Sequence, residues 1–282
     1  MHGSHTIVGA VMAGRPVPEG LSRVIAWLRC PVCSEPLELA GRTLTCENRH
    51  CFDIARQGHL NLLLRATPKN ADTSEMIAAR NRFLSGGWYE PLTRRVVAAL
   101  AGAERLLESG AGTGHYIGAF LDSVPEATGL AVDISPAACR HAARRSARLG
   151  AVVADTWDRL PIATRCVDAV LCVFAPRNPE EFRRVLTPDG RLVVVTPGDD
   201  HLAELRKNLG LLNLDPEKLE RLDASMRGLT LVDREELTHP LDLPVEATRD
   251  LVAMGPNAFH EHASPTAMRT TATFIISTFL AL

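Results

Sequence analysis

Three cysteines and a histidine near the start of the chain have the types and spacing of a metal site. Cys30 and Cys33 flank two residues, and after twelve more residues Cys46 is followed four positions later by His50. Two such pairs supply four soft or borderline ligands, which suits tetrahedral Zn²⁺. Because four protein ligands leave no position for a reactive water, the spacing predicts a structural zinc ion.

The spacing leaves two candidates for the fourth ligand, because Cys51 adjoins His50. A thiolate in isolation is the stronger ligand for such a metal. A redox C-x-x-C motif is the alternative interpretation of Cys30 and Cys33, but the βαβ context of redox motifs is missing here. Seven cysteines, an odd number, also favour metal ligands and free thiols over a disulfide framework.

A glycine-rich segment is the second feature that could do chemistry. Glu108 follows a short apolar run, and Gly110, Gly112 and Gly114 come after it at alternate positions. Glycines allow the backbone to approach a ligand closely at the carboxyl edge of a parallel sheet. A dinucleotide-binding fingerprint would need its third glycine at the position of His115, so that interpretation fails. A glycine-rich turn without a ligand is the remaining alternative.

The elements that would position these residues alternate as in an α/β protein with a parallel sheet. We expect helices over 73–84, 92–100, 116–121, 136–149 and 179–186, and strands over 104–109, 127–132, 151–154, 167–174, 191–196 and 271–282. Asp133 closes the second strand and Asp155 closes the third. Since the carboxyl ends of parallel strands meet at one edge, both carboxylates should lie near the glycine loop.

The chain divides by composition into four parts. Residues 1–20 are expected to form a flexible extension, 21–64 a zinc-binding module, 65–90 a linker with a helix, and 91–282 the large domain. The hydrophobic content of 46% suffices for a core, and the formal net charge of −2 does not by itself indicate a nucleic-acid partner. With no apolar run of roughly 20 residues and no signal pattern, the sequence predicts a cytoplasmic protein without a membrane segment.

In this order the pieces resemble the 23S ribosomal RNA (guanine-N1)-methyltransferases of the RlmA type, and within them the branch that gives tylosin and mycinamicin resistance. The segments that carry the resemblance are CPVC, CENRHCFDIARQGHLNLL, DTSEMIAARNRFLSGGWYEPL, LLESGAGTGHYIGAF, VFAPRNPEEFRRVLTPDGRLVVVTPGDDHLAEL and MGPNAFH. The glycine motif alone is shared with all class I S-adenosylmethionine-dependent methyltransferases. The ordered set is far more specific.

The resemblance implies a class I methyltransferase fold, with a Rossmann-like, mostly parallel seven-stranded sheet and a small N-terminal zinc-binding module. It favours His50 over Cys51 beside the three cysteine ligands. It implies S-adenosylmethionine contacts at Tyr89, Gly110, Gly112, Thr113, Gly114 and His201, with Asp133 accepting from the ribose hydroxyls and Asp155 near the adenine. The tyrosine of the family's "Y-A-P" motif is Phe174 here, which puts any role of that hydroxyl in doubt.

The function implied is methyl transfer to N1 of a guanine in a domain II hairpin of 23S rRNA, giving resistance to tylosin-type macrolides. Guanine N1 lies on the Watson–Crick edge, so the base must be unpaired or extruded. We expect it beside the loop after the fourth strand, where Phe174, Arg177 and Asn178 are the candidates for contact. No sequence feature identifies a general base, and the sequence leaves open whether the chain forms a homodimer.

The zinc-binding module is expected to position the RNA through Arg42, Arg49 and Arg56 as phosphate contacts. Two other functions share part of this pattern. One is methylation of a small molecule such as a quinone or lipid precursor, which would not need the zinc module. The other is a non-catalytic zinc-ribbon RNA-binding protein, against which the intact glycine loop and Asp133 count.

Overall fold

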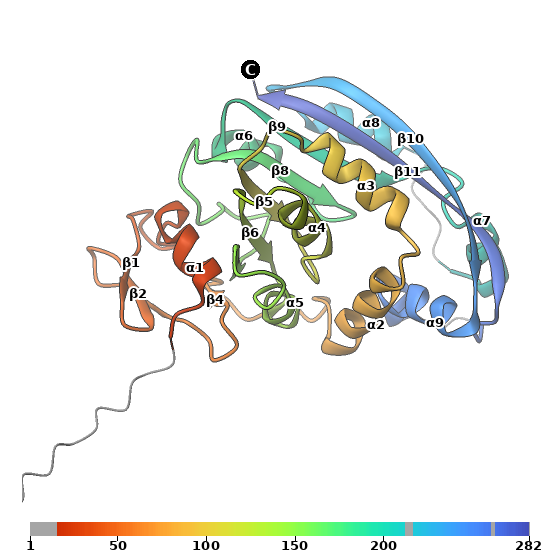
Figure 1. The fold of residues 1–282 in the computed structure, drawn as a ribbon, viewed down its shortest axis with the longest axis horizontal. Coiled ribbons are helices and arrows are strands. Elements are labelled where there is room, and N and C mark those ends of the chain that lie inside the picture. The colour runs from red at the N-terminus through yellow and green to blue at the C-terminus, as the bar shows by residue number, and fades with distance from the viewer. Residues whose placement is uncertain (1–15, 212–216, 261–262, 282) are drawn as a thin grey trace, which may run out of the picture.

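A mixed sheet runs through the centre of the protein in the computed structural model, which describes residues 16–211, 217–260 and 263–281 (Figure 1). Within these residues the sheet has eight strands in the order β10-β11-β9-β8-β5-β6-β7-β4. The strands are β4 (Leu60–Asn61), β5 (Arg105–Ser109), β6 (Thr128–Asp133), β7 (Leu149–Val153), β8 (Val167–Val173), β9 (Leu186–Pro197), β10 (Leu229–Leu243) and β11 (Met268–Ala281). Most of the expected N-terminal extension, residues 1–15, lies outside the described part.

The six strands from β9 to β4 are parallel, and β11 and β10 are added antiparallel beyond β9. The sheet therefore exceeds the expected seven strands by one. The additional strand is β4, which lies at the end of the zinc-binding segment. It pairs parallel with β7, and Leu60 lies opposite Val152. This pairing covers the edge of β7 that would otherwise expose its backbone N–H and C=O groups.

The helices lie on both faces of the sheet (Figure 1). They are α1 (Glu19–Val24), α2 (Ser74–Ser85), α3 (Glu90–Ala99), α4 (His115–Ser123), α5 (Pro136–Ala142), α6 (Pro179–Val185), α7 (Ala203–Leu209), α8 (Lys218–Ser225) and α9 (Val245–Ala253), with short 3₁₀ turns at Ile25–Trp27 and Pro256–Phe259. Helix α5 is shorter than expected, because Arg148 donates to the carbonyls of Leu121, Val124 and Ala127 and ties the chain to the end of α4. The residues up to Leu149 therefore belong to a turn and to β7.

Alternate residues of the strands feed two hydrophobic cores, one on each face. Val153 and Leu171 pack in the core that holds side chains of α2, α3, α4 and α9. Val152 and Val170 pack in the other core, together with α1, α6 and buried residues of the zinc-binding segment. The zinc-binding segment and the sheet thus share one core.

Three short antiparallel strands, β1 (Glu38–Ala40), β2 (Thr43–Thr45) and β3 (Cys51–Asp53), form a second sheet beside α1 (Figure 1). Helix α1 is pressed against the main sheet, since a Cβ atom built on Gly20 would lie 2.2 Å from the carbonyl oxygen of Leu149. Helix α1, which the sequence did not predict, therefore packs on β7.

Candidate cofactor site and zinc site

The glycine loop joins the end of β5 to the start of α4. Gly110, Gly112 and Gly114 have φ values of +71°, +53° and +71°, which side chains other than glycine rarely tolerate. A Cβ atom on Gly110 would lie 2.3 Å from the Cβ of Ala175, in the loop after β8. The methyl group of Ala175 therefore packs against the backbone of Gly110, and residues beside Ala175 lie next to the glycine loop.

Asp133 ends β6 beside this loop, as the sequence predicted. Its buried carboxylate accepts hydrogen bonds from the backbone N–H groups of Gly112 and Ser135, both at 2.8 Å. Burial raises the pKa of this carboxyl group, while the two N–H donors oppose that rise. The result is a fixed acceptor at the carboxyl edge of the sheet, and a carboxylate has lone pairs left for ligand hydroxyls.

Asp155 lies at the same edge, two residues beyond the end of β7. Asp133 is opposite Val153 in the pairing of β6 with β7, so the two carboxylates follow neighbouring strands. Arg65 of the linker forms an ion pair with Asp155 and a second one with Asp158 at 2.6 Å. No local pattern predicts a role for Arg65, because this pairing joins segments ninety residues apart.

An ion pair between Asp72 and Arg80 covers the glycine loop from the side of α2. A Cβ atom on Gly112 would lie 2.9 Å from Nη1 of Arg80, and Nη2 of Arg80 donates to the carbonyl of Met254 at 2.5 Å. Ser135 also donates its hydroxyl to the carbonyl of Asp72, at 2.6 Å. Both ionic residues lie in one of the segments that carry the family resemblance, but no role was predicted for either. Their spacing of eight residues around a helix start was the available signal.

Four aromatic side chains form one cluster near this edge. The ring of Phe274 lies 4.9 Å from that of Tyr89, 5.1 Å from that of His201 and 6.0 Å from that of Phe174. Nδ1 of His201 is 2.8 Å from the carbonyl of Thr273, so this nitrogen carries the donated proton. The structure thus brings together Tyr89 and His201, which the sequence analysis named as cofactor contacts. Burial raises the pKa of Tyr89 well above its ordinary value.

The loop after β8 presents two of its three candidate side chains. Phe174 has φ +52°, a strained value for an aromatic residue, and its side chain is 44% exposed. Arg177 makes no hydrogen bond or ion pair with another residue of the described part of the chain. Asn178 is different, because its amide nitrogen donates to the carbonyl of Thr156 at 3.0 Å and its oxygen accepts from the N–H of Glu181 at 3.3 Å. Its side chain therefore holds two loops together.

Glu108, the acid that precedes the glycines, is buried beneath the loop. Burial raises its pKa to about 8, although the N–H of Ile117 donates to it at 3.1 Å and partly offsets this. The carboxyl group is therefore largely neutral at pH 7, and it ties the first turn of α4 to the end of β5.

The cysteines and the histidine converge as a tetrahedral site requires. Nδ1 of His50 lies 3.5, 3.5 and 3.3 Å from the sulfurs of Cys30, Cys33 and Cys46, and the last two sulfurs are 3.7 Å apart. Ligands at about 2.3 Å (sulfur) and about 2.0 Å (nitrogen) around one ion give edges of roughly 3.8 and 3.5 Å. The group fits one Zn²⁺ ion, and all its ligand atoms lie within 4.8 Å of one another.

Cys51, the alternative fourth ligand, is exposed and its sulfur contacts the carbonyl of Arg49. Around the other ligands, a hydrogen bond from Asn48 lowers the pKa of Cys33 to about 6, whereas burial raises that of Cys30 to about 11. Of the arginines expected to contact RNA, Arg42 donates instead to the carbonyls of Pro16 and Ala55. Arg49 is exposed.

Taken together, a glycine loop and two strand-end carboxylates at the edge of this sheet define a class I methyltransferase domain, and the Cys₃His cluster defines a zinc ribbon preceding it. Comparisons with known proteins agree. The family model described as "RlmA, N-terminal" matches residues 28–67, and the model described as "Methyltransferase domain" matches residues 106–190.

Curated relatives cover most of the chain. A putative 23S rRNA (guanine-N(1)-)-methyltransferase of Micromonospora griseorubida is 46% identical over 83% of this chain and 87% of its own length. The 23S rRNA (guanine(748)-N(1))-methyltransferase of Streptomyces fradiae is 46% identical over 87% and 90%. A putative enzyme of the same name from Bacillus subtilis is 34% identical over 64% and 68%.

The chain therefore belongs to the family of 23S rRNA (guanine-N1)-methyltransferases, as its motifs predicted. S-adenosylmethionine and zinc are confirmed as the groups that its two parts are built to hold. This membership disfavours both the small-molecule methyltransferase and the non-catalytic RNA-binding protein. Among the described residues no helix is long and apolar enough to cross a membrane.

Proposed function

We propose that this protein transfers a methyl group from S-adenosylmethionine to N1 of a guanine in a domain II hairpin of 23S rRNA, in the cytoplasm. The relative from S. fradiae is named for guanine 748, and we take that base as the target here. We further propose that the methyl group confers resistance to tylosin-type macrolides.

The observation that carries this proposal is the contact between Gly110 and Ala175. It places the loop that contains Phe174 and Arg177 against the loop expected to hold the methyl donor. A base lying against this loop is therefore within reach of the donor, and holding the two in line is the main task of such an enzyme.

The residues of the cofactor site fit S-adenosylmethionine for two reasons. Its ribose hydroxyls need hydrogen-bond acceptors, and glycines without side chains let the ligand lie close to the protein backbone. Asp133 would accept from the ribose hydroxyls, Asp155 would lie near the adenine, and Gly110, Gly112, Thr113 and Gly114 would line the rest, with Tyr89 and His201 from the aromatic cluster. When bound, S-adenosylmethionine supplies a methyl group already activated by its sulfonium.

The loop after β8 then has a positioning task. Phe174 presents an exposed ring on a strained backbone, suited to stacking on an extruded guanine. Arg177 makes no hydrogen bond or ion pair with another described residue. No carboxylate occurs between Phe174 and Asn178, so the loop orients the base rather than removing the N1 proton. Asn178 keeps the loop in place through its bonds to Thr156 and Glu181.

We propose that the zinc-binding module binds a part of the RNA that lies away from the methylated base and so positions the RNA. Cys30, Cys33, Cys46 and His50 would bind the ion, which stabilises a segment too small to fold on its own. Arg49 remains a proposed phosphate contact. Arg56 is also exposed and is likewise proposed as a phosphate contact.

A single-turnover assay with tritiated S-adenosylmethionine and unmodified 23S rRNA tests the proposal. We expect R177A to lower the rate of methyl transfer without changing the affinity for S-adenosylmethionine. N178A should lower it through disorder of two loops, which its melting temperature would reveal. Unchanged rates for both variants would remove the loop from the mechanism. Methyl transfer to a quinone or lipid precursor and not to RNA would remove the function.

A further inference from the structure

Trp157 has the highest exposed fraction, 67%, of the exposed large apolar side chains in the described part of the protein. Scattered exposed apolar residues are ordinary on protein surfaces and need no explanation. Three further observations single out this tryptophan: its backbone is fixed, its loop belongs to the cofactor edge, and its neighbour lines a basic crevice.

The backbone around Trp157 is held from both sides. The amide of Asn178 donates to the carbonyls of Thr156, Trp157 and Asp158 at 3.0, 3.4 and 3.3 Å. The N–H of Trp157 itself donates to Asp155 at 2.9 Å, and Arg65 bridges Asp155 and Asp158. The loop thus offers the indole to solvent on a rigid support. Such preorganisation lowers the entropy lost on binding.

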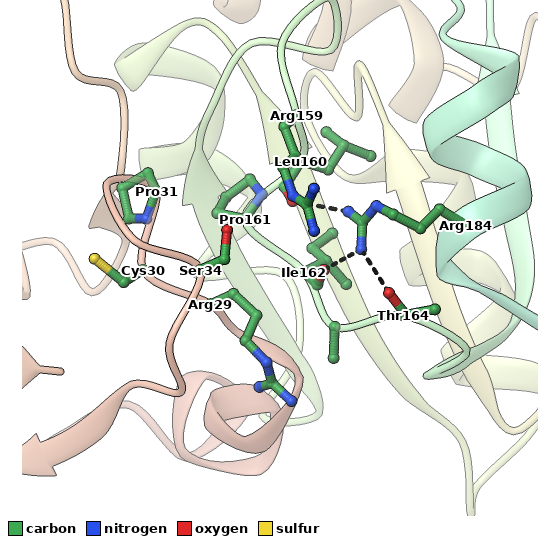
Figure 2. A pocket seen from close by; sticks show the side chains of 11 residues that line it. Arg29, Cys30, Pro31, Ser34, Arg159, Leu160, Pro161, Ile162, Thr164 and Arg184 are labelled. Carbon is green, nitrogen blue, oxygen red and sulfur yellow. Dashed lines mark hydrogen bonds between the residues drawn. The ribbon is translucent and has the colours of Figure 1, made fainter. Parts of the chain in front are cut away.

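The position of the loop connects the two functional parts. Trp157 is two residues beyond Asp155, at the carboxyl edge of the sheet. Two residues further on, Arg159 lines a crevice of about 160 Å³ between the Cys30–Ser34 turn of the zinc ribbon and residues 159–164 (Figure 2). A ligand that spans the cofactor edge and the zinc ribbon would therefore pass the indole.

The crevice is basic. Its lining residues include three arginines and no acidic residue. Arg184 is already engaged with the carbonyls of Leu160 and Ile162, and the side chain of Arg29 points away from the other two in Figure 2. Arg159 is exposed and makes no hydrogen bond or ion pair with another described residue. It is the arginine available to an anion entering there.

We propose that Trp157 stacks on a nucleobase of the RNA next to the methylated guanine, while Arg159 contacts the adjoining backbone phosphate. An exposed indole beside an arginine matches single-stranded or looped RNA, whose unpaired bases stack on aromatic rings. This inference rests on the proposed function and adds to Phe174 a second contact, for a neighbouring base.

The test compares four variants with the parent protein, using an in vitro transcript of the domain II hairpin that contains guanine 748. For W157A we expect RNA binding about 5- to 150-fold weaker, the usual cost of losing one stacked base. W157F should recover most of this loss. R159A should reduce the slope of log K against log salt concentration by about one, as expected for the loss of one phosphate contact. W157A should leave that slope unchanged.

V232A is the matched control, because Val232 is also exposed (51%) but lies on β10, at the opposite end of the sheet from β7. It should bind RNA like the parent. Calorimetry with S-adenosylmethionine should give the same affinity for W157A and the parent. The inference is overturned if W157A binds the hairpin as the parent does, or if its loss appears in cofactor affinity instead. A parent protein that methylates no rRNA would refute the proposed function itself.

Discussion

Replacing Gly110 with alanine tests how closely the glycine loop is fitted to the loop after β8. The new Cβ would lie 2.3 Å from the Cβ of Ala175, well inside van der Waals contact, at a residue with φ +71°. A side chain in this left-handed region costs about 1–2 kcal/mol, and overpacking of this kind costs about 1–3 kcal/mol more. We therefore expect G110A to be less stable by roughly 2–5 kcal/mol.

A matched glycine separates the two terms. Gly102 also has a positive φ, +84°, but a Cβ atom there would meet nothing within 4 Å. G102A should therefore lose only about 1–2 kcal/mol, the backbone term alone. In the double variant G110A/A175G the Cβ of Ala175 is gone, and the next atom, its Cα, is at an ordinary 3.7 Å. The clash should then disappear while the backbone term remains.

Urea unfolding of the parent, G110A, A175G and the double variant gives the coupling free energy between positions 110 and 175 directly, with G102A as the control. We expect a coupling of about 1–3 kcal/mol. Calorimetry with S-adenosylmethionine should show lost affinity for G110A and partial recovery in the double variant. If G110A and G102A were equal in stability, with no coupling to Ala175, the contact between the glycine loop and the loop after β8 would not exist in solution.

Three further predictions concern buried or bound groups. The pKa of Glu108 rises from 4.5 to about 8 on folding, so between these pH values the folded state binds a proton that the unfolded state has lost. Glu108 therefore makes the free energy of unfolding fall as the pH rises through this range. E108Q should show a shallower fall in urea titrations, and a slope identical to that of the parent would contradict the raised pKa. H50A should lose zinc in metal analysis and C51A should keep it, and the reverse result would place the thiolate in the site. R80M should weaken S-adenosylmethionine binding about tenfold by leaving Asp72 unpaired beside the glycine loop, and unchanged calorimetry would show that the ion pair only packs α2.

The sequence predicted five of the six parallel strands, because each of these five contains a short apolar run bounded by turn residues. Strand β4, only two residues long, was not predicted. The same runs fixed where strands end, and so placed Asp133 and Asp155 at one edge with the glycine loop. Spacing alone could not decide between His50 and Cys51. The two residues are adjacent, and the conformation of the chain between β2 and β3 determines which of their side chains points toward the three cysteine sulfurs.

Strand β10 was not predicted from the sequence, and its composition explains why. It is the edge strand of the sheet, mostly exposed, and it carries charged residues in succession from Asp233 to Glu236. Its first half has neither an apolar run nor an alternating pattern, and Pro240 interrupts the alternation of Leu237, Leu241 and Leu243 in its second half. Its pairing with β11 along fourteen registered positions defines it, and that pairing is a long-range property.

Contacts between distant segments were missed as well. Arg65 pairs with Asp155, Asn178 holds Thr156, and Ala175 meets Gly110, each across more than twenty residues. Local patterns specify an element and its ends, but they carry no record of which loops meet. The order of parallel strands predicts that loops share an edge, and the structure adds which side chains touch there.

Primer extension on 23S rRNA shows whether this protein methylates N1 of a guanine, and of which one. Unmodified rRNA is incubated with the purified protein and S-adenosylmethionine, because a methyl group on guanine N1 blocks base pairing and stops reverse transcriptase. We expect a new stop at guanine 748 that depends on S-adenosylmethionine and disappears with D133A. Full-length extension through every guanine of domain II, with a protein that binds zinc and S-adenosylmethionine, would contradict the proposed function.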